Sequence, residues 1–319
     1  MDRLVSMLRA AGDPTRLRLL LLLRQAELTV SELIEIVGQS QPRVSRHLKL
    51  LSEAGLVERF KEGSWVFCRA ADRGVGADLG RAIADLADPA LQEADRARLS
   101  HVRAARAEAA SAYFKANAAE WERIRALHAP EQEVEDAILR RLTGRPIHDL
   151  LDAGTGTGRM LELLAPHAAR AVGIDVSSEM LAIARDRLLR AGINDAQVRL
   201  GDAYRLPFAN GAGDEGFDVV LFHQVLHYMD DPGAAVAEAA RVMKKGGRLL
   251  IADFASHTVE FLRDEFAHRR LGFSDREVGG WLSAAGLTAA GVETIAPHAD
   301  AGEKLTVKLW LADKKKDGG

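Results

Sequence analysis

The chain has 319 residues and a net charge of −3 at neutral pH, with 47% hydrophobic and 28% charged residues. At roughly 150 residues per domain this length predicts two domains, and this composition is ordinary for a globular protein, with no need for disorder, disulfides or metal to hold the fold. Because Cys68 is the only cysteine, an internal disulfide and a multi-cysteine metal site are excluded, which is typical of a reducing compartment. The apolar run from Leu17 to Leu23 contains Arg18 and is far shorter than the ~20 residues that span a bilayer. With no signal peptide before it, we expect a cytoplasmic protein that binds no metal and no membrane.

Charge is unevenly distributed along the chain. Residues 1–70 carry eleven Lys and Arg against eight Asp and Glu, whereas the remainder carries 32 against 38. A mildly basic amino-terminal part is a weak indication of nucleic-acid contact, because affinity depends on where cations cluster.

Three short helices are predicted in the first 55 residues. Asp13 and Pro14 mark the start of the first, which carries a stripe of leucines and ends near Gln25. Thr29 caps the second, and Gly38 ends it with the residue type that tolerates a left-handed backbone. The third begins near Gln41 and Pro42 and places on one face the residues Val44, Leu48, Leu51 and Gly55.

The opposite face of the third helix is cationic and able to form hydrogen bonds. Two short helices, a tight turn and such a helix form the arrangement in which the last helix enters the major groove of DNA. Arginine reads guanine bidentately there, and Ser or Gln bonds bases or phosphates, although a cationic face can also be simply solvated. The candidate DNA-binding residues are Ser40, Gln41, Arg43, Ser45, Arg46 and Lys49. Strands at 56–60 and 64–69 around the turn of Lys61, Glu62 and Gly63 then predict a hairpin, the wing.

Residues 38–70, GQSQPRVSRHLKLLSEAGLVERFKEGSWVFCRA, together with AAGDPTRLRLLLLL, closely resemble the ArsR family of bacterial winged-helix repressors. The resemblance implies a homodimer on palindromic double-stranded operator DNA, with Arg43, Ser45, Arg46 and His47 facing the DNA and Lys61 touching phosphate. His47 has an alternative role in packing beside the core stripe. Many ArsR proteins sense metals through cysteines on the second helix, but residues 28–33 contain none, so metal sensing at that site is not expected.

The stretch from residue 72 to 142 is rich in Ala, Arg, Glu and Leu and should be mainly helical, with breaks at Pro89 and Pro130. Residues 75–110 include the expected dimerisation helix. Tyr113 and Trp121 belong to an aromatic stripe in SAYFKANAAEWERIR that resembles the helix over the cofactor in many class I methyltransferases, and plain packing explains the same stripe.

From Pro146 onward, short apolar runs alternate with helical patterns, which predicts a parallel sheet covered by helices. The expected strands are at 147–151, 171–174, 197–200, 217–222 and 248–252. We therefore expect an α+β winged helix-turn-helix domain at 1–95, a helical connector and lid at 96–142, and an α/β Rossmann-like domain at 143–319.

The first of these strands runs into a glycine-rich loop, Asp152-Ala-Gly-Thr-Gly-Thr-Gly158. The GxGxxG dinucleotide fingerprint fails here because Arg159 and Leu161 stand where its third glycine would be. The glycines let the backbone approach the amino-acid and ribose portions of a ligand, and Asp152 either anchors the loop or receives the ligand's ammonium.

Carboxylates end the next two strands as well. Asp175 lies about 20 residues past the loop, where an acidic residue accepts hydrogen bonds from ribose hydroxyls. Asp202 is placed either to bond the exocyclic amine of adenine or to cap a turn.

The series LLDAGTGTGRM, VGIDVSSEML, GDAYRLPF, FDVVLFHQVLHYMDDP and KKGGRLLIADF strongly resembles the motifs of class I S-adenosylmethionine (SAM)-dependent methyltransferases, and FSDREVGGWLSAAGL continues the likeness. The resemblance implies a seven-stranded sheet whose last strand, near Lys304 to Leu311, is antiparallel. It also implies the cofactor SAM, with S-adenosylhomocysteine (SAH) as its product. The expected cofactor-binding residues are Asp152, Gly154, Thr155, Gly156, Gly158, Asp175, Val176, Asp202, Ala203 and His223, with Tyr113 and Trp121 above them.

Methyl transfer depends mainly on positioning the nucleophile. If the acceptor must lose a proton, His223, His227 and Tyr228 are candidates for a general base, although His227 has a structural alternative. The absence of cysteines from the second domain argues against arsenite as the acceptor. A small-molecule acceptor is one candidate, and the sequence does not specify the acceptor's identity. We expect an ArsR-type regulator whose operator affinity is coupled to SAM or SAH and whose methyltransferase domain is active. The alternatives are a SAM- or SAH-sensing repressor without catalysis and a methyltransferase whose front domain only dimerises.

Overall fold

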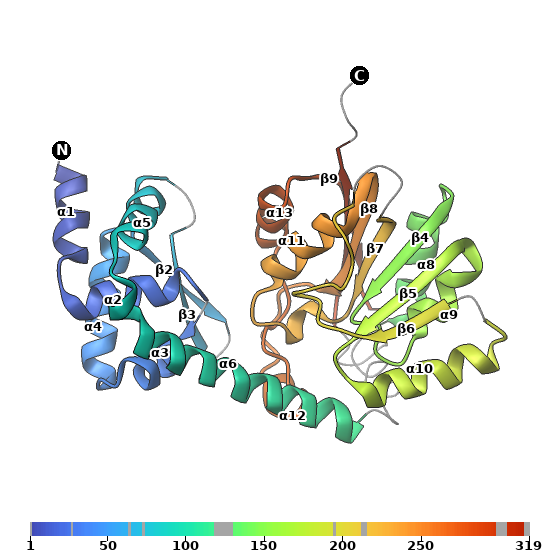
Figure 1. Cartoon of the computed structure of the whole chain (residues 1–319), viewed down its shortest axis with the longest axis horizontal. Coiled ribbons are helices and arrows are strands. Elements are labelled where there is room, and N and C mark those ends of the chain that lie inside the picture. The colour runs from blue at the N-terminus through green and yellow to red at the C-terminus, as the bar shows by residue number, and fades with distance from the viewer. Residues whose placement is uncertain are drawn as a thin grey trace. The chain divides into compact units, whose positions relative to one another are not determined.

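The computed structural model describes residues 2–26, 28–62, 65–71, 74–117, 130–193, 196–211, 216–297 and 305–315. The chain forms two compact units, Met1–Ala109 and Ala110–Gly319 (Figure 1). The helix α6 (Pro89–Asn117) begins in the first unit and continues into the second.

The first unit contains helices and a small antiparallel sheet of order β1-β3-β2. Its elements are α1 (Asp2–Ala11), α2 (Pro14–Leu23), β1 (Leu28–Thr29), α3 (Val30–Val37), α4 (Gln41–Glu53), β2 (Val57–Glu62), β3 (Trp65–Ala70), α5 (Gly74–Leu86) and the first part of α6.

Local sequence signals explain most of these boundaries. Asp13 accepts a hydrogen bond from the Arg16 amide at 3.0 Å and so caps α2. Thr29 and Glu32 form a reciprocal capping box at the start of α3, an arrangement that satisfies two otherwise unpaired amides. Gly38 ends α3 with a φ of 71°. The predicted helix-turn-helix and wing are therefore confirmed.

Four details differ from the sequence prediction. Helix α1 was not foreseen, the recognition helix ends at Glu53 so that Gly55 lies beyond it, and β2 continues to Glu62. The two-residue strand β1 was also missed, because it owes its conformation to pairing with β3, where Leu28 lies opposite Cys68. A contact 40 residues away in sequence leaves no local periodicity.

The core of the first unit also holds the beginning of α6. Leu20, Ile36 and Leu48 are fully buried in one cluster, and Leu99 and Val102 of α6 pack into the same cluster. The start of α6 is thus an integral part of the helix-turn-helix unit.

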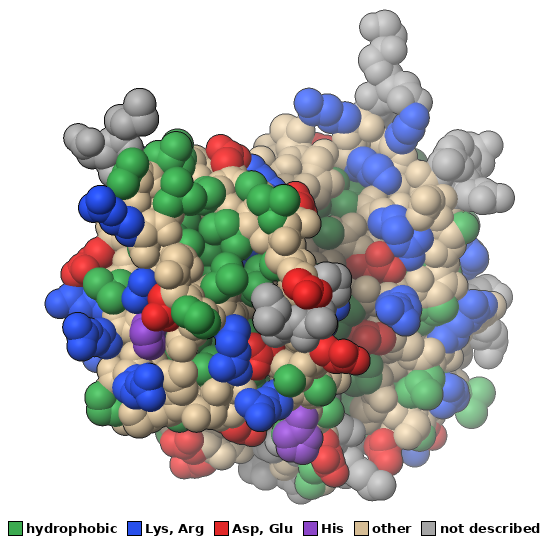
Figure 2. Space-filling model, turned by 60° about the vertical axis from the view of Figure 1, so that its left-hand side comes forward, with side chains coloured by type: hydrophobic (Ala, Val, Ile, Leu, Met, Phe, Trp, Pro, Cys, Tyr) green, Lys and Arg blue, Asp and Glu red, His purple; other side chains and the backbone are tan. Residues whose placement is uncertain are grey.

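Apolar side chains also lie on the outside of this unit. Leu4, Val5 and Leu8 of α1 are exposed, as are Val75 and Leu86 of α5, and Figure 2 shows hydrophobic side chains gathered on the upper part of the amino-terminal domain. A cavity of about 420 Å³ is lined by the α1–α2 turn, one side of α2, and Gln92 and Asp95 of α6.

The second unit is a seven-stranded sheet with helices on both faces, as far as its described residues show (Figure 1). The strand order is β6-β5-β4-β7-β8-β10-β9; the first five are parallel, and β10 is antiparallel to both β8 and β9. Its elements are α8 (Glu131–Leu142), β4 (Ile147–Ala153), α9 (Arg159–Leu164), η2 (Ala165–His167), β5 (Ala168–Asp175), α10 (Ser178–Arg190), β6 (Ala196–Leu200), β7 (Phe217–His223), η3 (Leu226–Tyr228), α11 (Pro232–Val242), β8 (Met243–Phe254), α12 (Phe261–Phe266), α13 (Asp275–Ala284), β9 (Leu287–Ile295) and β10 (Val307–Lys314). The predicted sheet and its antiparallel last strand are confirmed.

Successive side chains of a strand point to opposite faces of the sheet, so the second unit has one hydrophobic core on each face. Leu150 of β4 packs with residues of α8, α9 and α12, whereas Leu151 packs with residues of α11 and α13. Strand order reverses between β4 and β7, and in open sheets of this kind a ligand binds at the carboxyl ends of the strands beside such a switch point.

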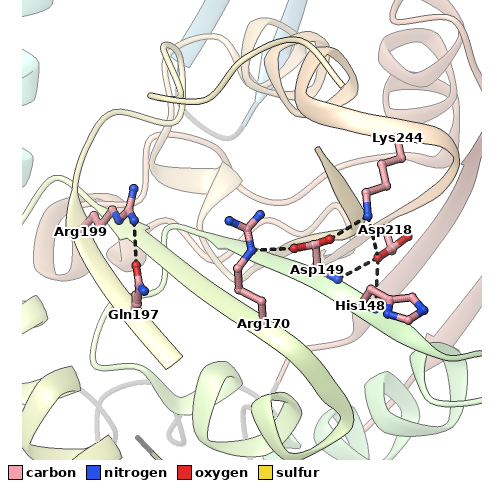
Figure 3. A network of polar contacts seen from close by, with 7 residues as sticks. All are labelled: His148, Asp149, Arg170, Gln197, Arg199, Asp218 and Lys244. Carbon is pink, nitrogen blue, oxygen red and sulfur yellow. Dashed lines mark hydrogen bonds and ion pairs between the residues drawn. The ribbon is translucent and has the colours of Figure 1, made fainter. Parts of the chain in front are cut away.

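The opposite, amino-terminal edge of the sheet is held by a charge network (Figure 3). Lys244 Nζ of β8 lies 2.7 Å from Asp149 Oδ2 of β4 and 3.4 Å from Asp218 Oδ2 of β7. Arg170 of β5 binds the other oxygen of Asp149 at 2.6 Å, and the amides of His148 and Asp149 donate to Asp218 at 3.1 and 2.8 Å. Four neighbouring strands are thereby tied together at the edge away from the expected ligand.

Candidate DNA-binding and cofactor sites

Helix α4 divides its side chains between the core and solvent. Val44, Leu48 and Leu51 are fully buried, whereas Arg43 and Arg46 on the other side are exposed. Helix burial of this kind fixes the orientation of the outward face. The structure therefore presents two guanidinium groups on the face that the sequence assigned to DNA.

The remaining candidate DNA-binding residues lie around this face in different environments. Ser40, Gln41 and Lys49 are exposed, and Lys61 is exposed on β2. Lys49 Nζ lies 3.8 Å from Glu53, which partly neutralises its charge. Ser45 and His47 are half-buried.

His47 lies beside the cap of α2. Its side chain is 16% exposed, and its Nδ1 is 3.8 Å from Asp13 Oδ1. The packing alternative for His47 thus has a geometric basis, while its role towards DNA stays a prediction.

The glycine loop follows β4 directly and leads into α9. Gly154, Gly156 and Gly158 have φ values of 80°, 53° and 79°, which side-chain-bearing residues adopt only at a cost. The amides of Gly154 and Thr155 both donate to the Ile174 carbonyl at the end of β5, at 2.8 and 3.0 Å. The loop is thereby folded back onto the neighbouring strand.

The structure adds a second reason for two of these glycines. A Cβ at Gly154 would lie 2.5 Å from Val225 Cγ2, and one at Gly158 would lie 2.9 Å from Ala184 Cβ. The space that these two glycines leave is thus occupied by the protein's own side chains, while the close approach of a ligand to the loop stays a prediction.

Asp152 is buried at the end of β4 and accepts a hydrogen bond from Thr155 Oγ1 at 2.6 Å. This contact holds the loop to the strand. It corresponds to the anchoring role that the sequence left open beside binding of an ammonium group.

Asp175 connects the second strand end to the same loop. Its Oδ2 accepts from the Gly156 amide at 2.8 Å and its Oδ1 from the Ser177 amide at 2.9 Å. Burial raises the pKa of Asp175 and is opposed by these amide hydrogen bonds. Val176, the next residue, is 60% exposed, so an apolar side chain faces solvent immediately beside the carboxylate.

Asp202 follows β6 and accepts a hydrogen bond from the Tyr204 amide at 2.8 Å. This is the turn-capping geometry that the sequence left as the alternative to adenine binding. Ala203 is buried in the core. Tyr204, which no sequence signal pointed to, is half-exposed, accepts from the Asp231 amide at 3.0 Å, and has its pKa raised by burial.

The end of β7 has unusual backbone geometry. Gln224 has a φ of 50°, and non-glycine residues in this region often mark functional sites. Its amide donates to Ala252 O at 2.7 Å, and its side-chain amide donates to Glu131 Oε1 at 3.0 Å. The preceding residue, His223, is buried.

His227 lies in the short 3-10 helix η3 and is paired with a carboxylate that the sequence analysis did not single out. Its Nδ1 is 2.6 Å from Asp253 Oδ1, and the two side chains are 2% and 0% exposed. The ring centroid of His227 lies 4.1 Å from that of Tyr228 and 4.2 Å from that of His268. Two of the three proposed bases are therefore adjacent, in a buried cluster with a second histidine.

The segment after α12 completes this cluster. The amides of Arg269 and Arg270 both donate to the His227 carbonyl at 3.0 Å, and Arg269 Nε lies 2.6 Å from Asp230. Sequence reasoning missed these residues because HRR reads as an ordinary charged stretch. A buried arginine paired with a carboxylate 39 residues away in sequence leaves no local pattern.

Two of the expected cofactor residues cannot be placed. The side chain of Tyr113 and the whole of Trp121 lie outside the described residues. Among the residues that are described, no three His, Cys, Asp or Glu side chains are grouped to hold a metal ion, and no helix has the length and apolar character needed to cross a membrane.

Comparison with known proteins agrees with this two-part architecture. The family model described as bacterial regulatory protein, arsR family, matches residues 13–59, and the model of a methyltransferase domain matches residues 151–251.

Curated relatives match the second domain. An uncharacterised methyltransferase of Bacillus subtilis is 32% identical over 109 residues, which are 34% of this chain and 42% of the relative. A ubiquinone/menaquinone biosynthesis C-methyltransferase of Cupriavidus necator is 38% identical over 114 residues, or 35% of this chain and 45% of the relative. The chain thus spans less than half the length of each of these relatives.

Among solved structures, a SAM-dependent methyltransferase of Thermotoga maritima, described as a possible histamine N-methyltransferase, superposes with a TM-score of 0.50 at 25% identity. The match covers 65% of this chain and all of that one. Residues 13–59 therefore form a helix-turn-helix domain of the bacterial ArsR regulatory family, and residues 151–251 form a class I SAM-dependent methyltransferase domain.

Proposed function

We propose that the protein is a DNA-binding transcriptional regulator whose second domain binds SAM and transfers its methyl group, and whose DNA affinity depends on the bound cofactor form. The observation that carries the proposal is that one chain presents two exposed arginines on a helix of ArsR type and a glycine loop tied to Asp175 at the carboxyl edge of a methyltransferase sheet.

The residues at this edge suit SAM. Asp175 is an acceptor at the place where ribose hydroxyls need one, the exposed Val176 offers an apolar surface for the adenine ring, and Asp152 supplies negative charge beside the loop. SAM would supply an electrophilic methyl group on a sulfonium. The protein's part is to hold the acceptor in line with that group and to exclude water.

On the DNA side, we assign the base and phosphate contacts to α4 and the wing. Arg43 and Arg46 are long, permanently charged and exposed, as groove-reading residues must be. Lys61 on the wing is placed to meet phosphate. Regulation of transcription follows from occupancy of an operator, whose sequence this chemistry does not specify.

Helix α6 supplies a physical connection for the coupling. Arg98 of α6 donates to Ile36 O at 2.8 Å, and Asp95 of α6 binds Arg18 through both carboxylate oxygens at 2.6 and 2.7 Å. Arg18 also donates to Val37 O at 3.4 Å. The carbonyls of Ile36 and Val37 lie at the end of α3, immediately before the turn into α4. A shift of α6 would therefore move the start of α4, the helix assigned to DNA.

We also propose that the first unit forms a homodimer. Apolar side chains of α1 are exposed beside a cavity of about 420 Å³, and exposed apolar surface of this kind marks association sites. A second copy of the chain would remove this surface from water and set the spacing of two α4 helices for a palindromic operator.

Isothermal titration of the purified protein with SAM and with SAH tests the proposal first. Saturable binding is expected, and its absence would overturn the cofactor assignment. Release of SAH from SAM, with deproteinised cell extract as the acceptor source, then separates an enzyme from a pure sensor, which would bind tightly without turnover.

Gel shifts at fixed salt with each cofactor form, on DNA selected by the protein from random duplexes, are expected to give different affinities. Equal affinities would reject the coupling.

A further inference from the structure

The pair of His227 and Asp253 bears on the chemistry of the methyl acceptor. Asp253 is fully buried and receives three hydrogen bonds: from His227 Nδ1 at 2.6 Å, from the Leu226 amide at 3.0 Å and from the Phe254 amide at 2.8 Å. An ionised carboxylate accepts hydrogen bonds and donates none. Two backbone N–H donors stabilise the ionised form of the carboxylate, so the short contact to His227 is a hydrogen bond donated by Nδ1–H.

This arrangement fixes the tautomer of His227. With the proton on Nδ1, the neutral ring carries its lone pair on Nε2, and the charged ring formed by proton uptake is stabilised by the carboxylate behind it. The main chain of the same residue is held by the Arg269 and Arg270 amides, which both donate to its carbonyl at 3.0 Å. Both ring orientation and residue position are thus determined before any ligand arrives.

His227 also lies at the cofactor edge of the sheet. Val225, two residues earlier, occupies the space beside Gly154, within 2.5 Å of the missing Cβ. The segment that carries His227 therefore packs directly on the glycine loop, at the strand-end edge where the acceptor must approach the methyl group.

From this geometry we infer that His227 Nε2 takes the proton of the methyl acceptor, that Asp253 is the positioning residue for it, and that the acceptor is a hydroxyl, phenol or amine whose nucleophilic atom carries a proton. The inference rests on the proposed methyl transfer. The acceptor's lone pair forms the bond to the methyl carbon, the C–S bond breaks with its electron pair going to sulfur, and the acceptor's proton passes to Nε2. A thioether acceptor, which has no proton to lose, would not need this pair.

Several other titratable side chains lie around the His227 ring. Tyr228 and His268 lie against the ring, and Phe254 separates it from His257. Burial, with the charge of His227 as the next cause, lowers the pKa of His257 to about 4, so His257 is neutral near neutral pH. Arg269 is paired with Asp230.

The first test needs no acceptor. Nitrogen NMR of protein with isotope-labelled histidine, saturated with SAH, is expected to show His227 neutral with its proton on Nδ1 and strongly deshielded by the carboxylate. In Asp253→Asn that deshielded signal should disappear. A His227 ring protonated on Nε2 in the wild type would overturn the inference even if SAM binding and turnover are intact.

The second test uses turnover with SAM and the deproteinised extract. Asp253→Asn and His227→Gln are expected to lower kcat about 10²–10⁴-fold, the usual contribution of a positioned proton acceptor, with unchanged SAH affinity and loss of the acidic limb of the pH–rate profile. Asp218→Asn is the matched control, since Asp218 likewise accepts two backbone amides but at the opposite edge. The Asp218→Asn variant should be less stable than the wild type but keep the wild-type pH–rate profile. If Asp253→Asn behaves like this control, Asp253 is structural only and the inference fails, whereas absence of SAM binding in the wild type would instead remove the proposed function.

Discussion

Gly154 and Val225 fit together only because position 154 has no side chain: a Cβ there would lie 2.5 Å from Val225 Cγ2. This contact joins the cofactor loop to the segment that follows β7 and carries His227. The loop and the segment that carries His227 are therefore in direct contact at this point.

Gly154→Ala should lower the free energy of unfolding by about 2–4 kcal/mol, from backbone strain at positive φ together with overpacking. Gly192→Ala is the control, because Gly192 has a φ of 70° but nothing within 4 Å of its Cβ position, so it suffers strain alone. Adding Val225→Ala to Gly154→Ala should recover part of the loss. Urea unfolding measures all four proteins, and equal losses for the two glycine variants would contradict the steric account.

Replacement of Arg43 or Arg46 by alanine should weaken operator binding by about 1–3 kcal/mol each and reduce its salt dependence if phosphate is contacted. Arg190→Ala is the matched control, since Arg190 is also an exposed arginine and belongs to the second unit, where it is paired with Asp186 at 2.9 Å. Fluorescence anisotropy over a salt series gives both quantities. Unchanged affinity in both arginine variants would favour the alternative in which the first domain only dimerises.

Most of the fold was predictable because its signals are local. Thr29 with Glu32, Gly38, and the spacing of Val44, Leu48 and Leu51 each report on one turn of backbone or one helix face, and the carboxylates at strand ends follow from the βα alternation. The site was predictable only in part. Asp253 sits in an apolar strand and becomes significant through His227, 26 residues away, while the spaces beside Gly154 and Gly158 are filled by residues of other elements. Such pairings depend on the packing of elements that periodicity does not determine.

The contact between α6 and the end of α3 predicts a variant that uncouples the domains. Arg98→Gln removes the hydrogen bond to Ile36 O, so the difference in DNA affinity between SAM- and SAH-bound protein, which is about 5–150-fold in typical allosteric proteins, should shrink. SAH affinity should stay unchanged. Arg96→Gln is the control, because Arg96 lies on the same helix and, among the residues that the structure describes, bonds to Gln92 within that helix. A full cofactor effect in Arg98→Gln would show that coupling does not pass through this contact.

The apolar face of α1 predicts the oligomeric state. Leu8→Glu should cost more than about 2 kcal/mol of association free energy, because a carboxylate would be buried without a partner. Leu189→Glu is the control, since Leu189 is a more exposed leucine of the second unit. Sedimentation equilibrium should find the wild type and Leu189→Glu dimeric and Leu8→Glu shifted to monomer. A monomeric wild type would refute the dimer.

The network at the amino-terminal edge of the sheet predicts a defined pH dependence of stability. Burial acts to raise the pKa of Asp149, but the hydrogen bonds and charges of Lys244 and Arg170 together outweigh it, so the pKa is lowered. Burial acts to lower the pKa of Lys244, but Asp149 and Asp218 together outweigh it, so the pKa is raised. A carboxylate with a depressed pKa stabilises the fold above its unfolded value of 3.8 and loses that contribution as pH falls through its folded pKa. A lysine with a raised pKa contributes fully below 10.5 and loses that contribution as pH rises through its folded pKa.

Lys244→Met should therefore destabilise the protein by about 1–3 kcal/mol between these limits, since hydrogen bonds to charged groups are lost, and the difference from wild type should shrink below pH 3.8 and above pH 10.5. Lys314→Met is the control. Lys314 donates to the carbonyls of Ala240 and Met243 at 2.8 Å, groups that do not titrate, so its effect should remain constant through the acid range. Urea unfolding at a series of pH values measures both variants. A Lys244→Met effect that persists undiminished in acid would mean that packing of the lysine stem, and not its charge, holds the four strand ends together.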